Sequence, residues 1–278
     1  MIPLNKIGLG SVQFGMQYGV SNLTGQTSQN EVLNVLRTAK KYDISIIDTA
    51  SAYGNAEKVL GDNDLTKFKI VSKFISEKNI QNEFDKSLAN LKLNSIYGYL
   101  SHRPLSLLNN PTLWEELQFL KSNKKVEKIG FSLNSPQEID KLLEKGYTPD
   151  LVQVPYNYFD NRFKDSLIAL KNMGCEIHTR SVFLQGLFFT DVQKLPSFFD
   201  DTKEIIKSLQ LDLGQDLSKS LLKYVLSLDF IDTVIMGVND EKQLKDNLKN
   251  IDLSRNLPDQ DFDFTDQILM PSNWPKMS

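Results

Sequence analysis

A short apolar run followed by a segment with apolar residues at helical spacing recurs about eight times along the chain. The apolar runs predict strands at Ile7–Gly10, Ser45–Asp48, Lys69–Lys73, Ile96–His102, Lys128–Ser132, Leu151–Val154, Glu176–Ser181 and Thr233–Met236. The segments between them predict helices at Ser28–Tyr42, Asn79–Leu91, Thr112–Asn123, Pro136–Lys145, Phe163–Met173, Gln215–Ser227 and Asp240–Asn250. No linker or change of composition interrupts the series. The sequence therefore predicts α/β architecture in a single domain over residues 1–278, a closed (β/α)8 TIM barrel.

An open, doubly wound parallel sheet is the alternative architecture for such a pattern. A sheet of that kind binds a dinucleotide at a Gly-x-Gly-x-x-Gly turn after an early strand. Here Gly8 and Gly10 are followed by Gln13, where the third glycine is required. The pattern favours the barrel, and any nucleotide must be bound by another arrangement of residues.

Composition narrows the class of partner. The 278 residues are 40% hydrophobic and 24% charged, as in an ordinary globular protein. The formal net charge is −3 and the basic residues are spread along the chain, so no binding to nucleic acid or to an anionic membrane surface is expected. The expected partner is a small molecule, and the sequence leaves the oligomeric state open.

The single cysteine, Cys175, excludes a disulfide within the chain and a cysteine-rich zinc site, and no metal is predicted. Its position in a helix-to-strand turn indicates a structural thiol. The amino-terminal segment lacks the basic and apolar regions of a signal peptide, and no apolar run approaches about 18 residues. We therefore expect a cytoplasmic protein.

Four polar side chains are expected at one end of the barrel, where the carboxyl ends of parallel strands meet. Asp48, Lys73 and His102 end three successive predicted strands, and Tyr53 lies in the loop after the first of these. An ammonium beside a phenol favours the phenolate, so the phenol becomes a better acid. With Asp48 holding Lys73 in place, Tyr53 could donate a proton to a carbonyl oxygen as negative charge develops there.

Each of these residues also has an ordinary structural interpretation. Lys73 could simply form an ion pair, and Asp48 could cap the segment that follows it. Tyr53 could be a packing residue, and His102 a buried structural histidine. Their occurrence together at the ends of neighbouring strands favours the catalytic interpretation. His178, within the predicted seventh strand, is interpreted as structural.

Three segments resemble motifs of one enzyme family. Ile47–Gly54, with Asn55–Gly61 after it, resembles the Asp-Thr-Ala-x-x-Tyr-Gly signature of the aldo/keto reductases and the small helix that follows it. Val71–Lys73 resembles the lysine segment of the family's third strand, and Leu100–Pro104 resembles the histidine segment of its fourth strand. The match runs in order over nearly the whole chain.

The resemblance implies an NAD(P)-dependent oxidoreductase that reduces an aldehyde or ketone. It implies that Tyr53 is the general acid, that Lys73 and Asp48 tune it, and that His102 orients or protonates the substrate carbonyl. A bound nicotinamide would supply the hydride.

The resemblance also implies a set of cofactor contacts: Ser11, Asp48, Ser132, Gln153, Arg180, Ser181, Gly186, Gly237, Gln243 and Asn247. Ser132 and Gln153 correspond to the residues that bind the nicotinamide amide, although Leu133 replaces the asparagine that often follows the serine. Arg180 stands where many members have an aromatic that stacks on the nicotinamide, and its planar guanidinium could stack there too.

NADP(H) is the cofactor that the resemblance implies first, and NAD(H) is the alternative. The family's arginine for the 2′-phosphate of NADP is replaced by Gln243, and Asp240 and Glu241 place negative charge nearby. Lys242 and Lys245 could compensate for that charge, and the predicted helix N-terminus is a natural anion site.

Short segments after His102 and at the C-terminus imply an open mouth, which suits a sugar or sugar-nucleotide carbonyl. Gly8–Gly19 and Arg180–Leu187 resemble a group of bacterial reductases from surface-polysaccharide and nonulosonic acid pathways. The longest irregular stretch, residues 183–199, follows the seventh strand and is expected to be functional.

Two other functions fit the same barrel. Lys73 could form a Schiff base in an aldolase-like site that uses no cofactor. The chain could instead be a non-catalytic module that binds nicotinamide and reports redox state to a partner. The proton donor Tyr53 and the adjacent Asp48 favour the reductase.

Overall fold

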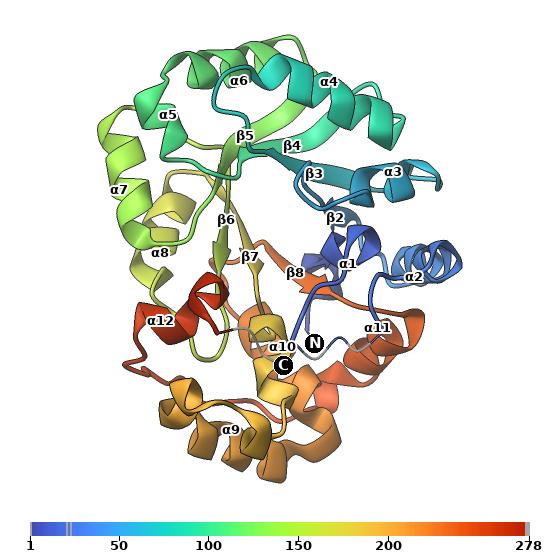
Figure 1. The fold of residues 1–278 in the computed structure, drawn as a ribbon, viewed down its shortest axis with the longest axis vertical. Coiled ribbons are helices and arrows are strands. Elements are labelled where there is room, and N and C mark those ends of the chain that lie inside the picture. The colour runs from blue at the N-terminus through green and yellow to red at the C-terminus, as the bar shows by residue number, and fades with distance from the viewer. Residues whose placement is uncertain (1, 21, 23, 276–278) are drawn as a thin grey trace.

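The structure, a computed structural model, describes residues 2–20, 22 and 24–275. Eight parallel strands pair in chain order and close into a barrel, in which β8 also pairs with β1 (Figure 1). The strands are β1 (Ile7–Gly10), β2 (Ile46–Asp48), β3 (Lys69–Phe74), β4 (Ile96–Ser101), β5 (Val126–Ser132), β6 (Leu151–Pro155), β7 (Glu176–Arg180) and β8 (Thr233–Gly237). The predicted (β/α)8 barrel is confirmed.

Helices surround the strands in Figure 1. They are α1 (Val12–Gly15), α2 (Gln29–Lys41), α3 (Ala56–Gly61), α4 (Ile80–Leu91), α5 (Ser106–Asn109), α6 (Thr112–Ser122), α7 (Pro136–Glu144), α8 (Lys164–Asn172), α9 (Asp200–Leu213), α10 (Leu217–Leu226), α11 (Glu241–Leu248) and α12 (Asp266–Leu269). Each predicted helix is present, with its ends shifted by at most two residues, whereas α9 and the short helices α1, α5 and α12 were not predicted. Among the described residues, no helix is both long and apolar enough to cross a bilayer.

Side-chain caps explain where several helices begin. Ser28 accepts a hydrogen bond from the backbone N–H of Glu31 at the start of α2. Ser135 and Glu138 form a capping box at the start of α7, where Pro136 suits the first helical position. Such caps satisfy backbone donors that the helix itself leaves unpaired.

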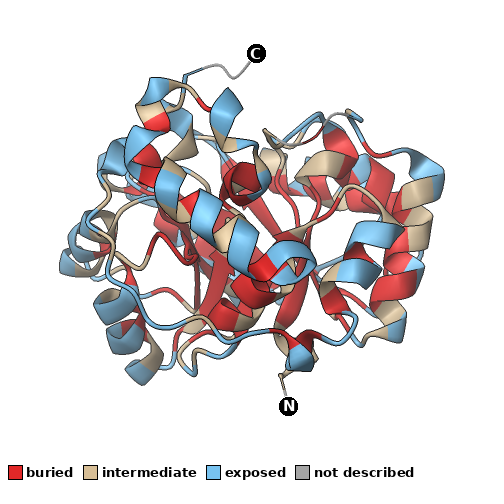
Figure 2. Ribbon diagram, turned by 90° about the horizontal axis from the view of Figure 1, so that it is seen from below, coloured by how far each residue is buried: buried red, intermediate tan, exposed pale blue. Residues whose placement is uncertain are grey.

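Most strand side chains are apolar and buried on both faces of the sheet, as expected for a parallel sheet covered by helices. Figure 2 shows buried residues along the strands and on the helix surfaces that face them. The small cluster Ile46, Val71, Tyr97, Leu100, Leu151 and Ile235 is separate from the large core that the helices join.

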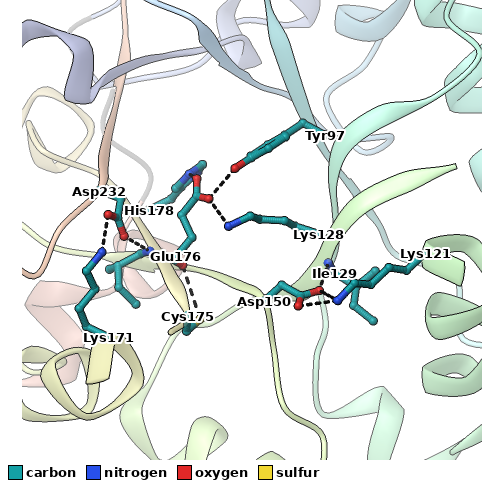
Figure 3. Close-up of polar contacts among 11 residues, drawn as sticks. Tyr97, Lys121, Lys128, Ile129, Asp150, Lys171, Cys175, Glu176, His178 and Asp232 are labelled. Carbon is teal, nitrogen blue, oxygen red and sulfur yellow. Dashed lines mark hydrogen bonds and ion pairs between the residues drawn. The ribbon is translucent and has the colours of Figure 1, made fainter. Parts of the chain in front are cut away.

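A polar network lies where β7 begins, at the end of the barrel opposite the carboxyl ends of the strands (Figure 3). The carboxylate of Glu176 accepts hydrogen bonds from the Tyr97 hydroxyl and from Lys128 Nζ, both at 2.6 Å, and contacts His178 Nε2 at 2.6 Å. Burial raises the Glu176 pKa, but the hydrogen bonds from these partners outweigh it and lower the pKa to about 2. His178 therefore belongs to this polar network, away from the carboxyl ends of the strands.

Candidate active site

A cavity of about 610 Å³ opens at the carboxyl ends of the strands. Its wall comes from residues at the ends of β1, β2, β4, β5, β6, β7 and β8 or in the loops that follow them, and from the C-terminal segment 269–272. A cavity of this size suits a small molecule or a cofactor. The fold places it at the end of the barrel where active sites of this architecture lie.

Lys73 is fully buried at the base of this cavity and has four oxygen neighbours. Its Nζ donates to both carboxylate oxygens of Asp48, at 2.6 and 2.7 Å, and to the carbonyl oxygen of Thr49 at 3.0 Å. The Tyr53 hydroxyl lies 3.4 Å from the same nitrogen. Asp48 and Tyr53 line the cavity, so the phenol lies between the ammonium and the open space.

Gln153 holds Asp48 from the other side. Its amide nitrogen, on β6, donates to Asp48 Oδ1 at 2.7 Å. Its Oε1 is buried and has no partner among the described residues. Ser132 is paired with Gln153 in register between β5 and β6, and both side chains are buried. Neither of these two predicted cofactor contacts is among the residues that line the cavity.

His102 approaches Tyr53 edge to face, with ring centroids 5.8 Å apart and an interplanar angle of 83°. Burial, followed by the positive charges of Lys73, Arg180 and Arg103, lowers the His102 pKa to about 3. The imidazole is therefore neutral at physiological pH. Because His102 lines the cavity, it can form a hydrogen bond to a ligand oxygen without adding a charge.

The other residues expected to bind the cofactor lie along the same cavity: Ser11, Arg180, Ser181, Gly186, Gly237, Gln243 and Asn247. The Ser11 hydroxyl is buried and has no partner within the part of the chain that the structure describes. A buried polar atom is normally paired, so this hydroxyl fits a polar ligand in the cavity. Together with Gln153 Oε1, it makes the donor and acceptor set compatible with a nicotinamide nucleotide.

Several lining residues were missed from the sequence. Tyr18 and Gln185 meet over the cavity, where Gln185 Nε2 donates to the Tyr18 hydroxyl at 2.9 Å. The backbone N–H of Val20 also donates to the carbonyl of Gln185 at 2.9 Å. Gln185 and Gly186 have positive φ values, 53° and 94°, which bend the loop after β7 towards this contact. In the sequence, only the Gly-rich stretch around Tyr18 and the long loop after β7 indicated that these two segments could contribute to the site.

Asn134 lies one position beyond the place where the family often has an asparagine, and it was not predicted from the sequence. The asparagine expected directly after Ser132 is replaced by Leu133, but Asn134 lines the cavity. Its Oδ1 accepts a hydrogen bond from Arg180 Nη2 at 2.7 Å, and the same nitrogen donates to the carbonyl oxygen of Leu133 at 2.9 Å. The guanidinium at the end of β7 is thus fixed to the loop after β5.

The N-terminus of α11 is occupied by protein carboxylates. Asp240 accepts from the backbone N–H of Gln243 at 2.6 Å, and Glu31 accepts from that of Glu241 at 2.6 Å. The natural anion site of this helix is therefore largely filled from within the chain.

The two lysines of α11 are also paired. Lys242 lies 2.7 Å from Asp246, and Lys245 lies 2.8 Å from Glu241. We expected these lysines to offset the negative charge near the cofactor, but each forms an ion pair with a carboxylate of its own helix. Gln243 lines the cavity beside them, and its Oε1 accepts from the backbone N–H of Asn239 at 2.9 Å.

Comparisons with known structures agree with the fold. The holo form of the aldo-keto reductase AKR11C1 from Bacillus halodurans superposes with a TM-score of 0.72 at 19% identity, over 91% of this chain and 88% of that one. The protein PA4992 from Pseudomonas aeruginosa superposes with a TM-score of 0.66 at 22% identity, over 87% and 88% of the two chains.

Sequence comparisons point the same way. Uncharacterized oxidoreductase YqkF of Bacillus subtilis is 22% identical over 89% of this chain and 87% of its own length. Aldo-keto reductase YhdN of the same organism is 26% identical over 60% of this chain and 54% of its own length. The model of the aldo/keto reductase family matches residues 6–270, which is nearly the whole chain. The chain therefore belongs to the aldo/keto reductase family.

Proposed function

We propose that this oxidoreductase reduces an aldehyde or ketone with a nicotinamide cofactor and uses Tyr53 as the general acid. The observation that carries the proposal is the placement of the Tyr53 hydroxyl 3.4 Å from the buried Lys73 nitrogen, at the wall of the cavity. The carboxylate of Asp48 fixes that nitrogen through two short hydrogen bonds. A positioned ammonium favours the anionic form of the phenol, which is the form left after proton donation.

The reaction needs one hydride and one proton. A bound reduced nicotinamide would supply the hydride that the carbonyl carbon receives. As the carbon–oxygen double bond opens, the oxygen gains negative charge and takes the proton from the Tyr53 hydroxyl. Lys73 stabilises the phenolate that remains, and Asp48 keeps the lysine in place. Neutral His102 donates a hydrogen bond to the same oxygen and orients it.

The cofactor would extend along the cavity from Tyr53 to α11. We assign Ser132 and Gln153 to the nicotinamide amide, Arg180 to the face of the ring, and Gln243 and Asn247 to the adenosine end. The remaining contacts would come from Ser11, Ser181, Gly186 and Gly237, which line the same wall. Gln153 supports this role through its unpaired Oε1.

NADP(H) follows from the family, but the charges at α11 support NAD(H). A 2′-phosphate carries about two negative charges and needs a cation that is not already paired. Lys242 and Lys245 are each paired with a carboxylate of the same helix, and Gln243 offers only a neutral amide.

Two further assignments concern the substrate and the rival chemistry. A sugar-derived carbonyl remains our proposed substrate class. A Schiff-base role for Lys73 is disfavoured, because the nitrogen is buried beneath the cavity wall and already donates to Asp48 and Thr49.

Separate titrations with NADPH and NADH, followed by nicotinamide fluorescence, test the cofactor. Steady-state rates on aldoses, keto-sugars and aromatic aldehydes then test the activity. Turnover with either cofactor supports the proposal. Binding of neither cofactor would refute it, and binding without turnover on this panel would favour the redox-reporting module.

A further inference from the structure

The cavity wall carries one positive charge that no carboxylate of the described residues neutralises. Among the described lining residues only Asp48 and Arg180 carry a formal charge. Asp48 is neutralised by Lys73, and His102 is neutral. Arg180 therefore gives the cavity one uncompensated positive charge.

The guanidinium of Arg180 is fixed but not saturated. Only Nη2 is bonded, to the carbonyl oxygen of Leu133 and to the amide oxygen of Asn134, both of which are neutral acceptors. Within residues 2–20, 22 and 24–275, it forms no ion pair with a carboxylate, and its Nε and Nη1 atoms make no hydrogen bond. An arginine positioned in this way is a preformed site for an anion.

Arg180 lines the same cavity as Tyr53 and His102, the residues proposed to contact the substrate carbonyl. It ends β7, and its contact with the loop after β5 takes the guanidinium past Pro155, the last residue of β6, which also lines the cavity. It lies near enough to His102 for its charge to lower the pKa of that histidine. The free donors of Arg180 and the proton-donating Tyr53 therefore belong to the same cavity.

From this geometry we infer that the substrate is an aldehyde or ketone that carries a carboxylate, and that Arg180 binds this carboxylate. The inference rests on the proposed carbonyl reduction. The Nε and Nη1 donors of Arg180 are free on the cavity wall, and a carboxylate is an anion that a guanidinium binds through such donors. The chemistry of reduction is unchanged: one hydride and one proton enter the carbonyl, and the carboxylate is not altered.

The test compares two substrates that differ only in this group, 4-carboxybenzaldehyde and benzaldehyde. For the wild type we expect kcat/KM to be at least about 10-fold higher for the charged aldehyde, the effect of one hydrogen bond to a charged group. The Arg180→Gln variant should bring the ratio of the two values to about 1. Arg180→Lys, which keeps the charge but loses the planar donor set, should retain part of it.

Arg103→Gln is the matched control. Arg103 also lies near His102, but it is largely exposed, faces Glu77 and does not line the cavity. Its removal should leave the substrate ratio at the wild-type value. An equal ratio in the wild type and in Arg180→Gln would overturn the inference. So would a loss of NADH and NADPH affinity in Arg180→Gln with no change in the ratio, because Arg180 would then serve the cofactor alone.

Calorimetry with benzoate and benzamide separates this inference from the proposed function. If neither aldehyde is reduced, the two aldehydes give no ratio, and benzoate binding alone decides the anion site. Benzoate that binds the wild type at least about 10-fold more tightly than Arg180→Gln, with no such difference for benzamide, supports the site. Equal benzoate affinity for the two proteins would overturn it.

Discussion

At the scale of single residues, the site depends on how buried charges are balanced. Lys73 is fully buried and Asp48 nearly so, which is costly unless the two charges are paired and hydrogen-bonded. Gln153 and the carbonyl of Thr49 supply the additional bonds. These bonds fix the position of the Lys73 ammonium beside Tyr53, so the proton transfer that we propose would need little rearrangement of the site.

Replacing Tyr53 by phenylalanine removes the proton donor and little else. We expect kcat to fall about 10²- to 10⁴-fold, with NADH affinity nearly unchanged, since the phenol acts on the substrate. Single-turnover kinetics and a fluorescence titration measure the two quantities. Tyr147→Phe is the control, because that hydroxyl contacts the Leu107 carbonyl outside the cavity. Near-wild-type rates in Tyr53→Phe would require another acid.

The low pKa of His102 predicts an absence of titration near neutrality. The pKa is about 3 in the folded protein and about 6.5 for an unperturbed histidine, so the unfolded chain binds more protons between these values. This histidine therefore contributes to stability above about pH 6.5, and the contribution declines as the pH falls through that window.

NMR of the two histidine rings measures this directly. The His102 resonance should keep its position from about pH 8 down to about pH 4.5. A His178→Asn variant assigns the signals, since the chain has 2 histidines. A His102 signal that moves with a midpoint near pH 6.5 would contradict the predicted neutral, enclosed ring.

At the scale of elements, the sequence predicts strands well and some helices poorly. The strands are short apolar runs buried on both faces, and such runs stand out in any sequence. Helix α9 follows a long irregular stretch and buries only Thr202, Ile206 and Leu213, so its apolar stripe is too sparse to recognise. Gly214, with φ of 50°, then separates α9 from α10, which corresponds to the predicted helix Gln215–Ser227.

The same limit applies to the site. Asp48, Lys73 and His102 could be predicted to lie together because strand order alone places them at one mouth. The bond from Gln153 to Asp48 spans the barrel and depends on side-chain geometry, which strand order does not specify. The meeting of Tyr18 with Gln185 depends on the backbone path of two loops, for which local sequence gives no rule.

Helix α11 gives a prediction about cofactor choice. Gln243→Arg places an unpaired cation on the cavity wall, next to lysines that are already paired. We expect the ratio of NADPH to NADH affinity to rise by about 10-fold, the effect of one charge-assisted contact. Asn82→Arg adds the same charge on exposed α4, away from the cavity, and should leave the ratio unchanged. Equal shifts for both cofactors would indicate a general charge effect.

At the scale of the whole molecule, the two ends of the barrel have separate tasks. The carboxyl ends of the strands carry the cavity, and the opposite end carries the network around Glu176. That network joins β4, β5 and β7 through a carboxylate, so it ties together strands far apart in the sequence (Figure 3). It should support stability without touching the chemistry.

Glu176→Gln tests this division. The Glu176 pKa is about 2 in the folded protein, against an ordinary value of 4.5. This carboxylate therefore stabilises the fold fully above about pH 4.5 and loses that effect as the pH falls towards 2. We expect the variant to lose about 1.5–3 kcal/mol at pH 7 in urea unfolding, and to depend less on pH between about 4.5 and 2. Glu144→Gln, at an exposed site on α7, should behave as wild type. Because the network lies opposite the cavity, kcat and KM of Glu176→Gln should stay within about two-fold of wild type at pH 7. A large loss of activity in a folded variant would mean that the two ends of the barrel are coupled.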